Sequence, residues 1–403
     1  MSGRPLRVVQ VGAGAMGVAW LRTLAAAEDV ELVGVADLDV ARAEAAVRTA
    51  CGSGGGSGGG SGGGSVVIAG SLGELLAATE PDAVVNVTVP AAHSTVNIEA
   101  LFAGLPVLCE KPAAPTLAEA LVQAAAAEAT GRLLMISQSR RYFAALTAFR
   151  ERIAELGTPG LLTTGFFRAP HFGGFRDEMP QPLLVDMAIH AFDAARHLLG
   201  QEPVSVVCES WNPSWSWYQG DASATATFLF SGGTRYVFTG SWCAEGRDTS
   251  WNGEWRAVGG GGTATWDGER CVTSSAGGRA EDVAPAAHEQ IAGALAEFVS
   301  AVRTGAEPDG AIKGNLRSLA MVEAAVRSAG TGERVGIGAL LERAYEEALA
   351  LPVRDEVRER LKSWGPRRPS SERPAAVGRS RRAAATTVRR TDGGAGHGFC
   401  PNP

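Results

Sequence analysis

Over the first 137 residues, short apolar runs alternate with longer, alanine-rich amphipathic stretches. The apolar runs predict β-strands, and the stretches between them are rich in strong helix formers. The predicted strands cover residues 6–11, 30–36, 66–69, 83–89, 106–109 and 133–136, and the predicted helices cover 15–27, 39–50, 72–78, 93–103 and 116–129. Alternation of strand and helix predicts parallel pairing through right-handed crossovers. We therefore expect residues 1–137 to form an α/β domain with a doubly wound parallel sheet.

The pattern changes after residue 138, where strands and helices no longer alternate. Helices are predicted over 140–156, 184–199, 288–304, 315–329 and 340–351, and strands over 161–168, 204–210, 222–230, 235–242, 254–258 and 263–266. Neighbouring strands set between groups of helices are typical of an α+β domain. We expect residues 138–350 to form such a domain, with a mostly antiparallel open sheet.

Two segments lack apolar periodicity. Residues 52–65 read GSGGGSGGGSGGGS, and from about residue 362 proline, arginine, serine and glycine dominate. Glycine-rich loops can bind phosphate, but this one joins a predicted helix to the next strand and so lies at the sheet edge opposite the ligand crevice. A GGGS repeat is instead typical of a flexible linker or a low-complexity insertion. Residues 362–403 are predicted to be a disordered basic tail.

The net charge of −6 combines two unlike regions. Residues 366–403 carry a net charge of +6, which leaves −12 for the first 365 residues. An acidic body argues against nucleic acid as the main partner, because phosphate binding needs a basic face. No apolar run approaches about 18 residues, the length of a membrane span, and the six cysteines are too widely spaced for a zinc site. We expect a cytoplasmic protein that binds neither membrane nor metal.

The turn between the first strand and the first helix has GxGxxG spacing. In a Rossmann dinucleotide-binding domain, the first glycine allows the tight turn, the second lets a pyrophosphate approach the backbone, and the third lets the helix pack on the strand. The helix N-terminus then faces the phosphates. The spacing alone is unspecific, but the strand–turn–helix context strengthens it. The predicted cofactor-binding residues here are Gly12, Ala13, Gly14, Ala15, Met16 and Gly17.

Asp37 ends the second predicted strand, 20 residues beyond Gly17. A carboxylate at this place accepts hydrogen bonds from the adenosine ribose and repels a 2′-phosphate. Because Leu38 rather than an arginine follows it, the sequence favours NAD over NADP as the cofactor. The alternative is that Asp37 caps the next helix, a role that Asp39 can fill equally well.

The sequence VLCEKPAA, residues 107–114, places Glu110 and Lys111 directly after the fifth predicted strand. The carboxyl edge of a doubly wound sheet is where the cofactor binds, and Pro112 restricts the backbone of Lys111 to extended conformations. An ammonium group there is suited to hydrogen-bond a reacting oxygen and to stabilise the charge that develops on it. The alternative is an ordinary surface Glu–Lys pair.

Asp186 and His190 lie four residues apart on a predicted helix and therefore on one face of it. A histidine near its ordinary pKa can take the proton of a hydroxyl group, and an adjacent carboxylate can orient the ring. The pair alone is unspecific, since the same spacing suits a metal half-site or a buried structural histidine. We favour catalysis, because the sequence offers no cluster of further metal ligands.

The motifs VGAGAMG, TVPAAHSTV, CEKPAAPTLAEA and LLVDMAIHAFDAARHLLG, in that order, resemble the Gfo/Idh/MocA family of NAD(P)-dependent oxidoreductases. The resemblance covers about residues 5–338, and it departs from the family at QPLLVD, where members usually have a glycine cluster. It implies Lys111, Asp186 and His190 as the catalytic residues. It further implies a cofactor and substrate surface that includes Thr88, Pro90, His93, Glu110, Lys111, Gln138 and Arg141.

The resemblance also implies hydride transfer between NAD(P) and a secondary hydroxyl of a sugar, inositol or related polyol. The implied assembly is a homodimer or homotetramer, in which the second domain binds both the substrate and another subunit. Two alternatives stay open, an NAD-using glycoside hydrolase or lyase and a non-catalytic dinucleotide-binding regulator, although a regulator is expected to lack the catalytic lysine. His171 is a further candidate substrate contact. Seven of the nine tryptophans lie between residues 211 and 266, where they pack the sheet, form an interface or contact a sugar.

Overall fold

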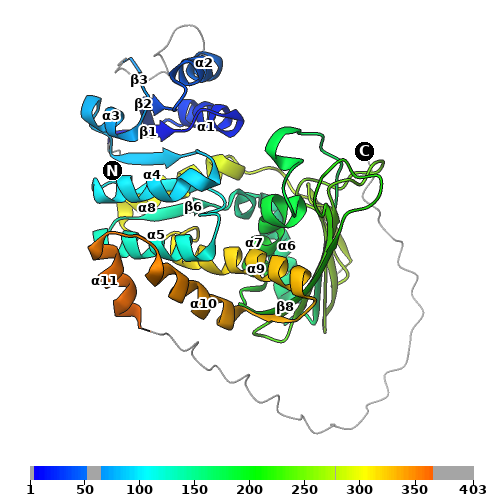
Figure 1. Cartoon of the computed structure of the whole chain (residues 1–403). Coiled ribbons are helices and arrows are strands. Elements are labelled where there is room, and N and C mark those ends of the chain that lie inside the picture. The colour runs from blue at the N-terminus through cyan, green and yellow to red at the C-terminus, as the bar shows by residue number, and fades with distance from the viewer. Residues whose placement is uncertain (1–3, 52–64, 277, 366–403) are drawn as a thin grey trace, which may run out of the picture.

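The computed structural model describes residues 4–51, 65–276 and 278–365. Most of the glycine-serine segment and most of the predicted tail therefore lie outside the described residues. The described chain contains two β-sheets. A group of helices lies between them, with the N-terminal sheet on one side of this group and the C-terminal sheet on the other (Figure 1).

The N-terminal sheet has six parallel strands in the order β3-β2-β1-β4-β5-β6. The strands are β1 (Leu6–Val11), β2 (Val30–Ala36), β3 (Val67–Ala69), β4 (Ala83–Asn86), β5 (Val107–Glu110) and β6 (Leu134–Ser137). The chain winds outward in opposite directions from β1 and β4, so that the carboxyl ends of these two strands open a crevice. The predicted doubly wound parallel sheet is confirmed.

Helices cover both faces of this sheet. One face carries α1 (Ala15–Ala26) and α2 (Val40–Cys51), and the other carries α3 (Leu72–Ala78), α4 (Pro90–Phe102) and α5 (Leu117–Thr130). α8 (Gln290–Thr304) returns from far along the chain to complete the first face, where Phe298 and Val299 pack with Trp20 of α1. The N-terminal domain is thus completed by a helix that the sequence pattern assigns to the second domain.

The C-terminal sheet has nine strands in the order β14-β13-β12-β11-β7-β10-β9-β8-β15. The strands are β7 (Leu161–Phe167), β8 (Pro203–Trp211), β9 (Ser223–Phe230), β10 (Arg235–Ser241), β11 (Glu254–Gly259), β12 (Gly262–Trp266), β13 (Cys271–Ser274), β14 (Arg279–Asp282) and β15 (Val335–Gly336). Neighbouring strands are antiparallel except β7 and β10, which are parallel. The mostly antiparallel sheet is confirmed. The sequence pattern does not predict β13, β14 and β15, because strands this short show too little alternation.

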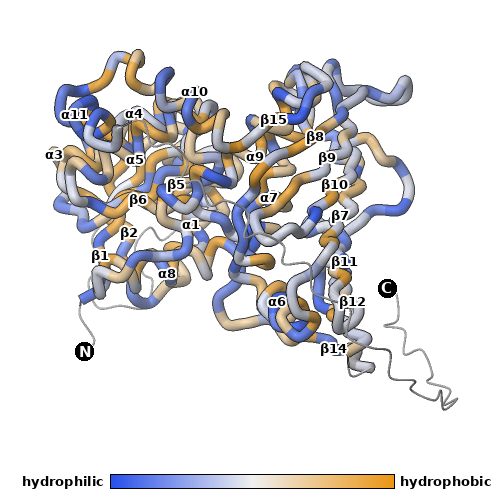
Figure 2. Tube along the Cα trace, turned by 90° about the horizontal axis from the view of Figure 1, so that it is seen from below, coloured by the Kyte–Doolittle hydropathy of each residue, from blue (hydrophilic) through white to orange (hydrophobic). Residues whose placement is uncertain are grey.

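Helices pack on one face of this sheet. α6 (Ala144–Glu155), α7 (Ala188–Leu199) and α9 (Ile312–Thr331) lie between it and the N-terminal domain (Figures 1 and 2). Two predicted helices begin differently from expectation. A 3-10 turn, Ser139–Tyr142, precedes α6, and a π-helical turn, Leu183–Met187, precedes α7. The π-helical turn matters for the site because it carries Asp186.

Two helices follow α9 and pack on α5 of the N-terminal domain: α10 (Ile337–Ala350) and α11 (Asp355–Trp364). The sequence pattern does not predict α11, whose residues 362–364 fall within the segment expected to be disordered. Its sequence is mostly charged, and Figure 2 shows it as hydrophilic. Only Val357 and Leu361 are buried, so its apolar pattern is too sparse to identify a helix.

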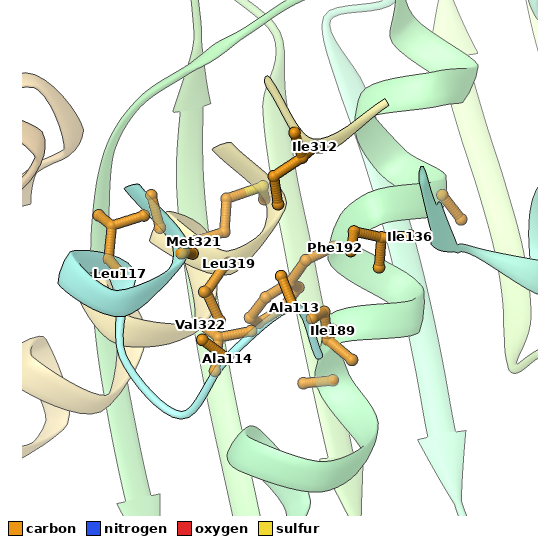
Figure 3. Packing of buried hydrophobic residues seen from close by; sticks show 14 of the residues in the cluster. Ala113, Ala114, Leu117, Ile136, Ile189, Phe192, Ile312, Leu319, Met321 and Val322 are labelled. Atoms are coloured by element: carbon orange, nitrogen blue, oxygen red, sulfur yellow. The ribbon is translucent and has the colours of Figure 1, made fainter. Parts of the chain in front are cut away.

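A buried cluster between the two domains holds the chain just after Lys111. Ala113 and Ala114 are fully buried, and they pack in the same cluster as Phe192 of α7 and several residues of α9 (Figure 3). The turn that carries Lys111 is therefore packed beside the helix that carries His190. Apolar packing thus contributes to the relative position of the two side chains.

Candidate active site

The three glycines of the first turn lie in three different environments. Gly12 has a φ of 101°, and a Cβ there would lie 2.5 Å from the carbonyl oxygen of Val87. A Cβ on Gly17 would lie 2.5 Å from the carbonyl oxygen of Gly12, so helix and turn touch at this point. A Cβ on Gly14 would meet nothing within 4 Å. Two glycines therefore serve the fold, and the third borders open space.

The open space lies at the N-terminus of α1. Gly14 is the N-cap residue, and no side chain of the described chain caps the helix. The first backbone N–H groups of α1 therefore point outward without a partner side chain, which is the arrangement that binds a pyrophosphate. Ala15 and Met16, in the first turn, are exposed beside it, whereas Ala13 is buried. These residues fit a dinucleotide.

Asp37 lies at the carboxyl end of β2, beside the glycine turn. Its carboxylate accepts hydrogen bonds from the backbone N–H of Ala13 at 2.8 Å and from that of Asp39 at 2.9 Å, and it forms an ion pair with Arg42. Burial raises its pKa, but these donors outweigh burial and leave the pKa below its ordinary value. Asp39 accepts from the backbone of Arg42 and so caps α2 itself, which leaves Asp37 for another role. The sequence analysis did not predict that Arg42 forms an ion pair with Asp37.

Lys111 lies directly beyond β5, at the same edge of the sheet. Its Nζ donates to the backbone oxygen of Asp186 at 3.0 Å and lies 3.4 Å from a carboxylate oxygen of that residue. The Lys111 side chain is only 18% exposed, and its peptide bond to Pro112 is cis. The structure thus brings together two residues that the sequence separates by 75 positions.

Glu110 lies inside β5, whereas the sequence pattern ends this strand at residue 109. It is 9% exposed, and its carboxylate accepts hydrogen bonds from the indole N–H of Trp20 at 2.8 Å and from the backbone N–H of Lys111 at 3.0 Å. Burial raises its pKa. The alternative of a surface Glu–Lys pair is therefore wrong. Glu110 ties α1 to the Lys111 turn rather than presenting a free carboxylate to the crevice.

Asp186 contacts two cations rather than His190. Its carboxylate accepts from Nε of Arg176 at 2.7 Å and lies near Lys111 on its other side. Burial raises the pKa of Asp186, but the charge of Lys111 and the hydrogen bond from Arg176 leave it below its ordinary value. No hydrogen bond joins Asp186 to His190 in the described structure. The expectation that Asp186 orients the ring is not met, because the π-helical turn and the two cations hold the carboxylate elsewhere.

His190 lies one turn further on, in α7. Its Nδ1 is buried and has no hydrogen-bond partner among the described residues. Burial, followed by the charges of Lys111 and Arg140, lowers the pKa of His190 well below its ordinary value of 6.5. The ring is therefore neutral near pH 7, as a proton acceptor must be.

Thr88, Pro90 and His93 follow β4 at the same sheet edge. Pro90 is the first residue of α4, and Thr88 is partly exposed. The ring of His93 is fully buried: Nδ1 lies 2.7 Å from the carbonyl oxygen of Pro112 and Nε2 lies 3.0 Å from that of Thr88. Both ring nitrogens contact backbone oxygens, so His93 bridges the β4 and β5 turns and does not itself face the crevice.

Of the two residues expected after β6, neither presents a free polar group to open solvent. Gln138 is 1% exposed, and its Nε2 has no partner among the described residues. Arg141 donates two hydrogen bonds of 2.7 Å to Asp193 and a third to the carbonyl oxygen of Asp309. The prediction that Arg141 contacts the cofactor or substrate is therefore wrong, because its guanidinium already binds Asp193 and Asp309 within the protein. The preceding residue, Arg140, instead lines a small cavity with His190.

His171 lies in the loop after β7 and is largely exposed. Its Nε2 contacts Glu245 at 3.0 Å, and its ring stacks on Trp217 with 3.7 Å between centroids. The same loop brings Arg176 to Asp186. Three of the tryptophans, Trp242, Trp255 and Trp266, are at most 3% exposed and pack the sheet. These three pack the sheet, whereas Trp211 and Trp215 are exposed.

No three histidine, cysteine or acidic side chains lie close enough to hold a metal ion within residues 4–51, 65–276 and 278–365. Over the same residues, no helix has the length and apolar character needed to cross a membrane.

Two successive parts of the chain match two models of one protein family. Residues 6–138 match the model described as an oxidoreductase family with an NAD-binding Rossmann fold, and residues 148–265 match the GFO/IDH/MocA C-terminal domain. The chain belongs to the Gfo/Idh/MocA family. It is therefore a member of an oxidoreductase family, with an N-terminal domain that binds NAD. The glycine turn and Asp37 lie within the residues that match the NAD-binding model.

Among Gfo/Idh/MocA relatives, an uncharacterised protein of Sinorhizobium fredii is 26% identical over 359 residues, 83% of this chain and 97% of its own length. Inositol 2-dehydrogenase 4 of Saccharopolyspora erythraea is 32% identical over 210 residues, 51% of this chain. The match spans 57% of the length of that dehydrogenase.

Solved structures share the fold over most of this chain. An Agrobacterium radiobacter oxidoreductase in complex with NAD+, L-tartaric acid and magnesium superposes with a TM-score of 0.74 at 20% identity, covering 83% of this chain and 99% of its own. A putative myo-inositol dehydrogenase of Sinorhizobium meliloti gives a TM-score of 0.68 at 23% identity, covering 82% and 99%.

Proposed function

We propose that the protein is an NAD-dependent dehydrogenase that oxidises a secondary hydroxyl of a sugar, inositol or related polyol, or reduces the matching ketone. The observation that carries this proposal is the contact of Lys111 with Asp186, 3.0 Å from Nζ to the backbone oxygen, one helical turn from His190. This group lies at the sheet edge where the glycine turn also opens. The inositol dehydrogenases among the relatives support the substrate class.

Each side chain has a defined part in this reaction. Lys111 donates a hydrogen bond to the reacting oxygen and stabilises the negative charge that develops on it. Neutral His190 takes the hydroxyl proton as the adjacent C–H bond breaks, and the product is a ketone. When bound, NAD supplies the acceptor for the hydride. The hydride departs from the carbon and carries both electrons of the C–H bond. One proton and one hydride are removed in total.

Asp186 acts through Lys111 in this proposal. With its pKa below the ordinary value, Asp186 is ionised at neutral pH and holds the ammonium group at the end of β5. Arg176 in turn holds the carboxylate from the opposite side. Asp186 is thus a positioning residue, and His190 is the only proton acceptor of the three.

The test is NADH formation across a panel of inositols, aldoses and sugar acids. Lys111→Met should lower kcat by about 100- to 1,000-fold, as expected for the loss of one donor to a developing oxyanion, while NADH binding changes little. The control is Lys362→Met, because the side chain of Lys362 is exposed on the surface of α11; this variant should behave like the original protein. Unchanged turnover in Lys111→Met refutes the assignment. Cleavage of a glycoside without net NADH formation identifies the hydrolase or lyase alternative instead.

We also propose that the protein forms a homodimer or homotetramer through the outer face of the C-terminal sheet. Its helices cover the opposite face, and partly exposed side chains such as Thr227 of β9 and Thr239 of β10 lie on the outer one. Light scattering should give a multiple of the chain mass, and Thr227→Arg should reduce it. A monomer refutes this part of the proposal. The cytoplasmic location stays a prediction from the sequence.

A further inference from the structure

Asp186 makes two unequal contacts with the cations on either side of it. Nε of Arg176 lies 2.7 Å from one carboxylate oxygen, whereas Nζ of Lys111 lies 3.4 Å from the other. The same Nζ donates at 3.0 Å to the backbone oxygen of Asp186, which carries no net charge. Charge-assisted hydrogen bonds between nitrogen and oxygen are about 2.7–2.9 Å long. Arg176 therefore forms the strong ionic bond to this carboxylate, and Lys111 forms the weak one.

The weak bond leaves Lys111 with a free donor. An ammonium group has three N–H donors. One N–H of Lys111 is used at the backbone oxygen of Asp186, and a second faces the distant carboxylate oxygen, so the third remains for a reacting oxygen. If Arg176 is removed, Lys111 becomes the only cation of the described chain in contact with the carboxylate. The carboxylate then draws the ammonium group toward itself and reduces the positive charge that a reacting oxygen meets.

The loop between β7 and the π-helical turn places Arg176. This residue ends a 3-10 turn, Gly174–Arg176. Its guanidinium carbon lies 5.2 Å from the ring centre of Phe172 and 4.8 Å from that of Phe175, and both rings are more than half exposed. Because a cation over the face of an aromatic ring is attracted by the ring electrons, the two rings hold the guanidinium where its Nε reaches Asp186.

The same loop also reaches the His190 side of the proposed active site. The ring of Phe172 stacks on that of Trp251 with 6.2 Å between centroids, and Trp251 lines the small cavity beside His190. The loop is also tied to the segment between β8 and β9, where the backbone N–H of Gln219 donates to the carbonyl oxygen of Asp177 at 2.8 Å. One loop thus contacts both the cavity wall beside the proton acceptor and the carboxylate that faces the lysine.

We infer that Arg176 is a positioning residue: by binding the carboxylate of Asp186, it keeps the ammonium group of Lys111 free to donate to the reacting oxygen. This inference deepens the proposed function and rests on it. The sequence motifs do not point to Arg176, which lies 10 residues before Asp186. The competing interpretation is an ion pair that only stabilises the loop. That interpretation predicts a loss of stability when the pair is broken, and no change at Lys111.

The first test is a double-mutant cycle with Arg176→Met and Asp186→Asn, measured with the substrate that the panel of inositols, aldoses and sugar acids identifies. Arg176→Met should lower kcat by about 10-fold and leave KM within about threefold, because the charge on the reacting oxygen develops only in the transition state. In the Asp186→Asn background, Arg176→Met should change kcat by less than about twofold, since the carboxylate through which Arg176 acts is gone.

Two further variants serve as controls. Arg176→Lys keeps a cation, and a single hydrogen bond rather than a bidentate pair joins Arg176 to Asp186, so this variant should keep at least about a third of kcat. Arg247→Met removes an exposed arginine from the loop between β10 and β11 and should behave like the original protein. Urea unfolding shows whether each variant is folded, and Arg176→Gln repeats the cycle if Arg176→Met does not fold.

The second test needs no turnover. The chain has three lysines, Lys111, Lys313 and Lys362. Protein made with lysine labelled with ¹³C at Cε therefore gives three side-chain signals in NMR, and Lys111→Met identifies the signal of Lys111. This signal should move in Arg176→Met, because the carboxylate of Asp186 approaches the ammonium group. It should stay in place when Arg176→Met is added to Asp186→Asn. The signals of the other two lysines should not move in either case.

The outcomes separate the two proposals. If folded Arg176→Met keeps the original kcat, or lowers kcat equally in both backgrounds, the inference is overturned while the proposed function stands. A kcat of Arg176→Lys as low as that of Arg176→Met also overturns it, because the positive charge is then not what acts. If no compound is oxidised, the proposed function fails, and the Lys111 signal alone decides the inference: a signal that does not move in Arg176→Met overturns it.

Discussion

Gly14→Ala should separate cofactor binding from folding. The φ of Gly14 is −70°, which alanine adopts without strain, and the added Cβ meets no protein atom within 4 Å. Replacing glycine by alanine at such a position leaves stability unchanged or raises it by about 0.4–1 kcal/mol, because the unfolded chain loses freedom. The added methyl group should therefore affect the binding of a cofactor in the open space beside Gly14, and not the folding of the protein.

The cost to NAD binding follows from distances. A phosphate oxygen approaches a backbone N–H to about 2.9 Å between heavy atoms, whereas a methyl carbon needs about 3.5–4 Å from its neighbours. The pyrophosphate must therefore move away from the turn and lose at least one hydrogen bond to a charged group, worth about 1.5–3 kcal/mol. We expect the dissociation constant for NADH to rise by about 10- to 100-fold.

Gly12→Ala provides the contrast. Its φ of 101° and the 2.5 Å approach to Val87 force a strained turn, and the free energy of unfolding should fall by about 2–4 kcal/mol. NADH fluorescence titration measures affinity, and urea unfolding of the cofactor-free protein measures stability. Wild-type NADH affinity in Gly14→Ala, or a loss of stability as large as that of Gly12→Ala, refutes the reasoning.

Three further outcomes are expected. The pKa of His190 is lowered, mainly by burial, so the acid limb of the kcat/KM profile should lie below pH 6.5; a limb above that value contradicts the role of His190 as base. Arg141→Met removes the ion-pair partner of the buried Asp193 carboxylate and leaves it only the hydrogen bond from Ser318. This change should cost about 3–5 kcal/mol in urea unfolding, and a cost below about 1 kcal/mol contradicts it. Trp20→Phe removes a hydrogen-bond donor to Glu110 and should lower the free energy of unfolding by about 1–3 kcal/mol. An unchanged urea unfolding transition contradicts this prediction.

Most of the fold follows from local sequence patterns. The six parallel strands have continuous apolar runs because both faces of the sheet are buried, and such runs are visible in sequence. Helix α11 is missed because only Val357 and Leu361 are buried within it. The placement of α8 on the N-terminal sheet is missed for a different reason: its apolar residues show that it packs, but not on which domain.

The sites where sequence reasoning fails are the polar ones. Arg140 and Arg141 are adjacent and chemically identical, yet one is fully hydrogen-bonded and the other is unpaired beside a cavity. No sequence signal separates them, because the difference depends on Asp193, 52 residues further on. Asp186 was expected to face His190 by helical spacing, but the π-helical turn changes the spacing and two distant cations hold its carboxylate.

The sequence by itself determined the doubly wound sheet, the glycine turn and the family, and it singled out Lys111, Asp186 and His190 as catalytic candidates. These depend on short-range periodicity and on motifs within one strand–turn–helix unit, where backbone geometry follows from neighbouring residues. Only the tertiary structure decided the partners of Glu110, His93 and Asp186 and the unpaired state of Arg140. Those outcomes depend on which side chains meet after distant segments pack. A buried polar atom without a partner costs free energy, so the nearest available donor or acceptor determines which contact forms.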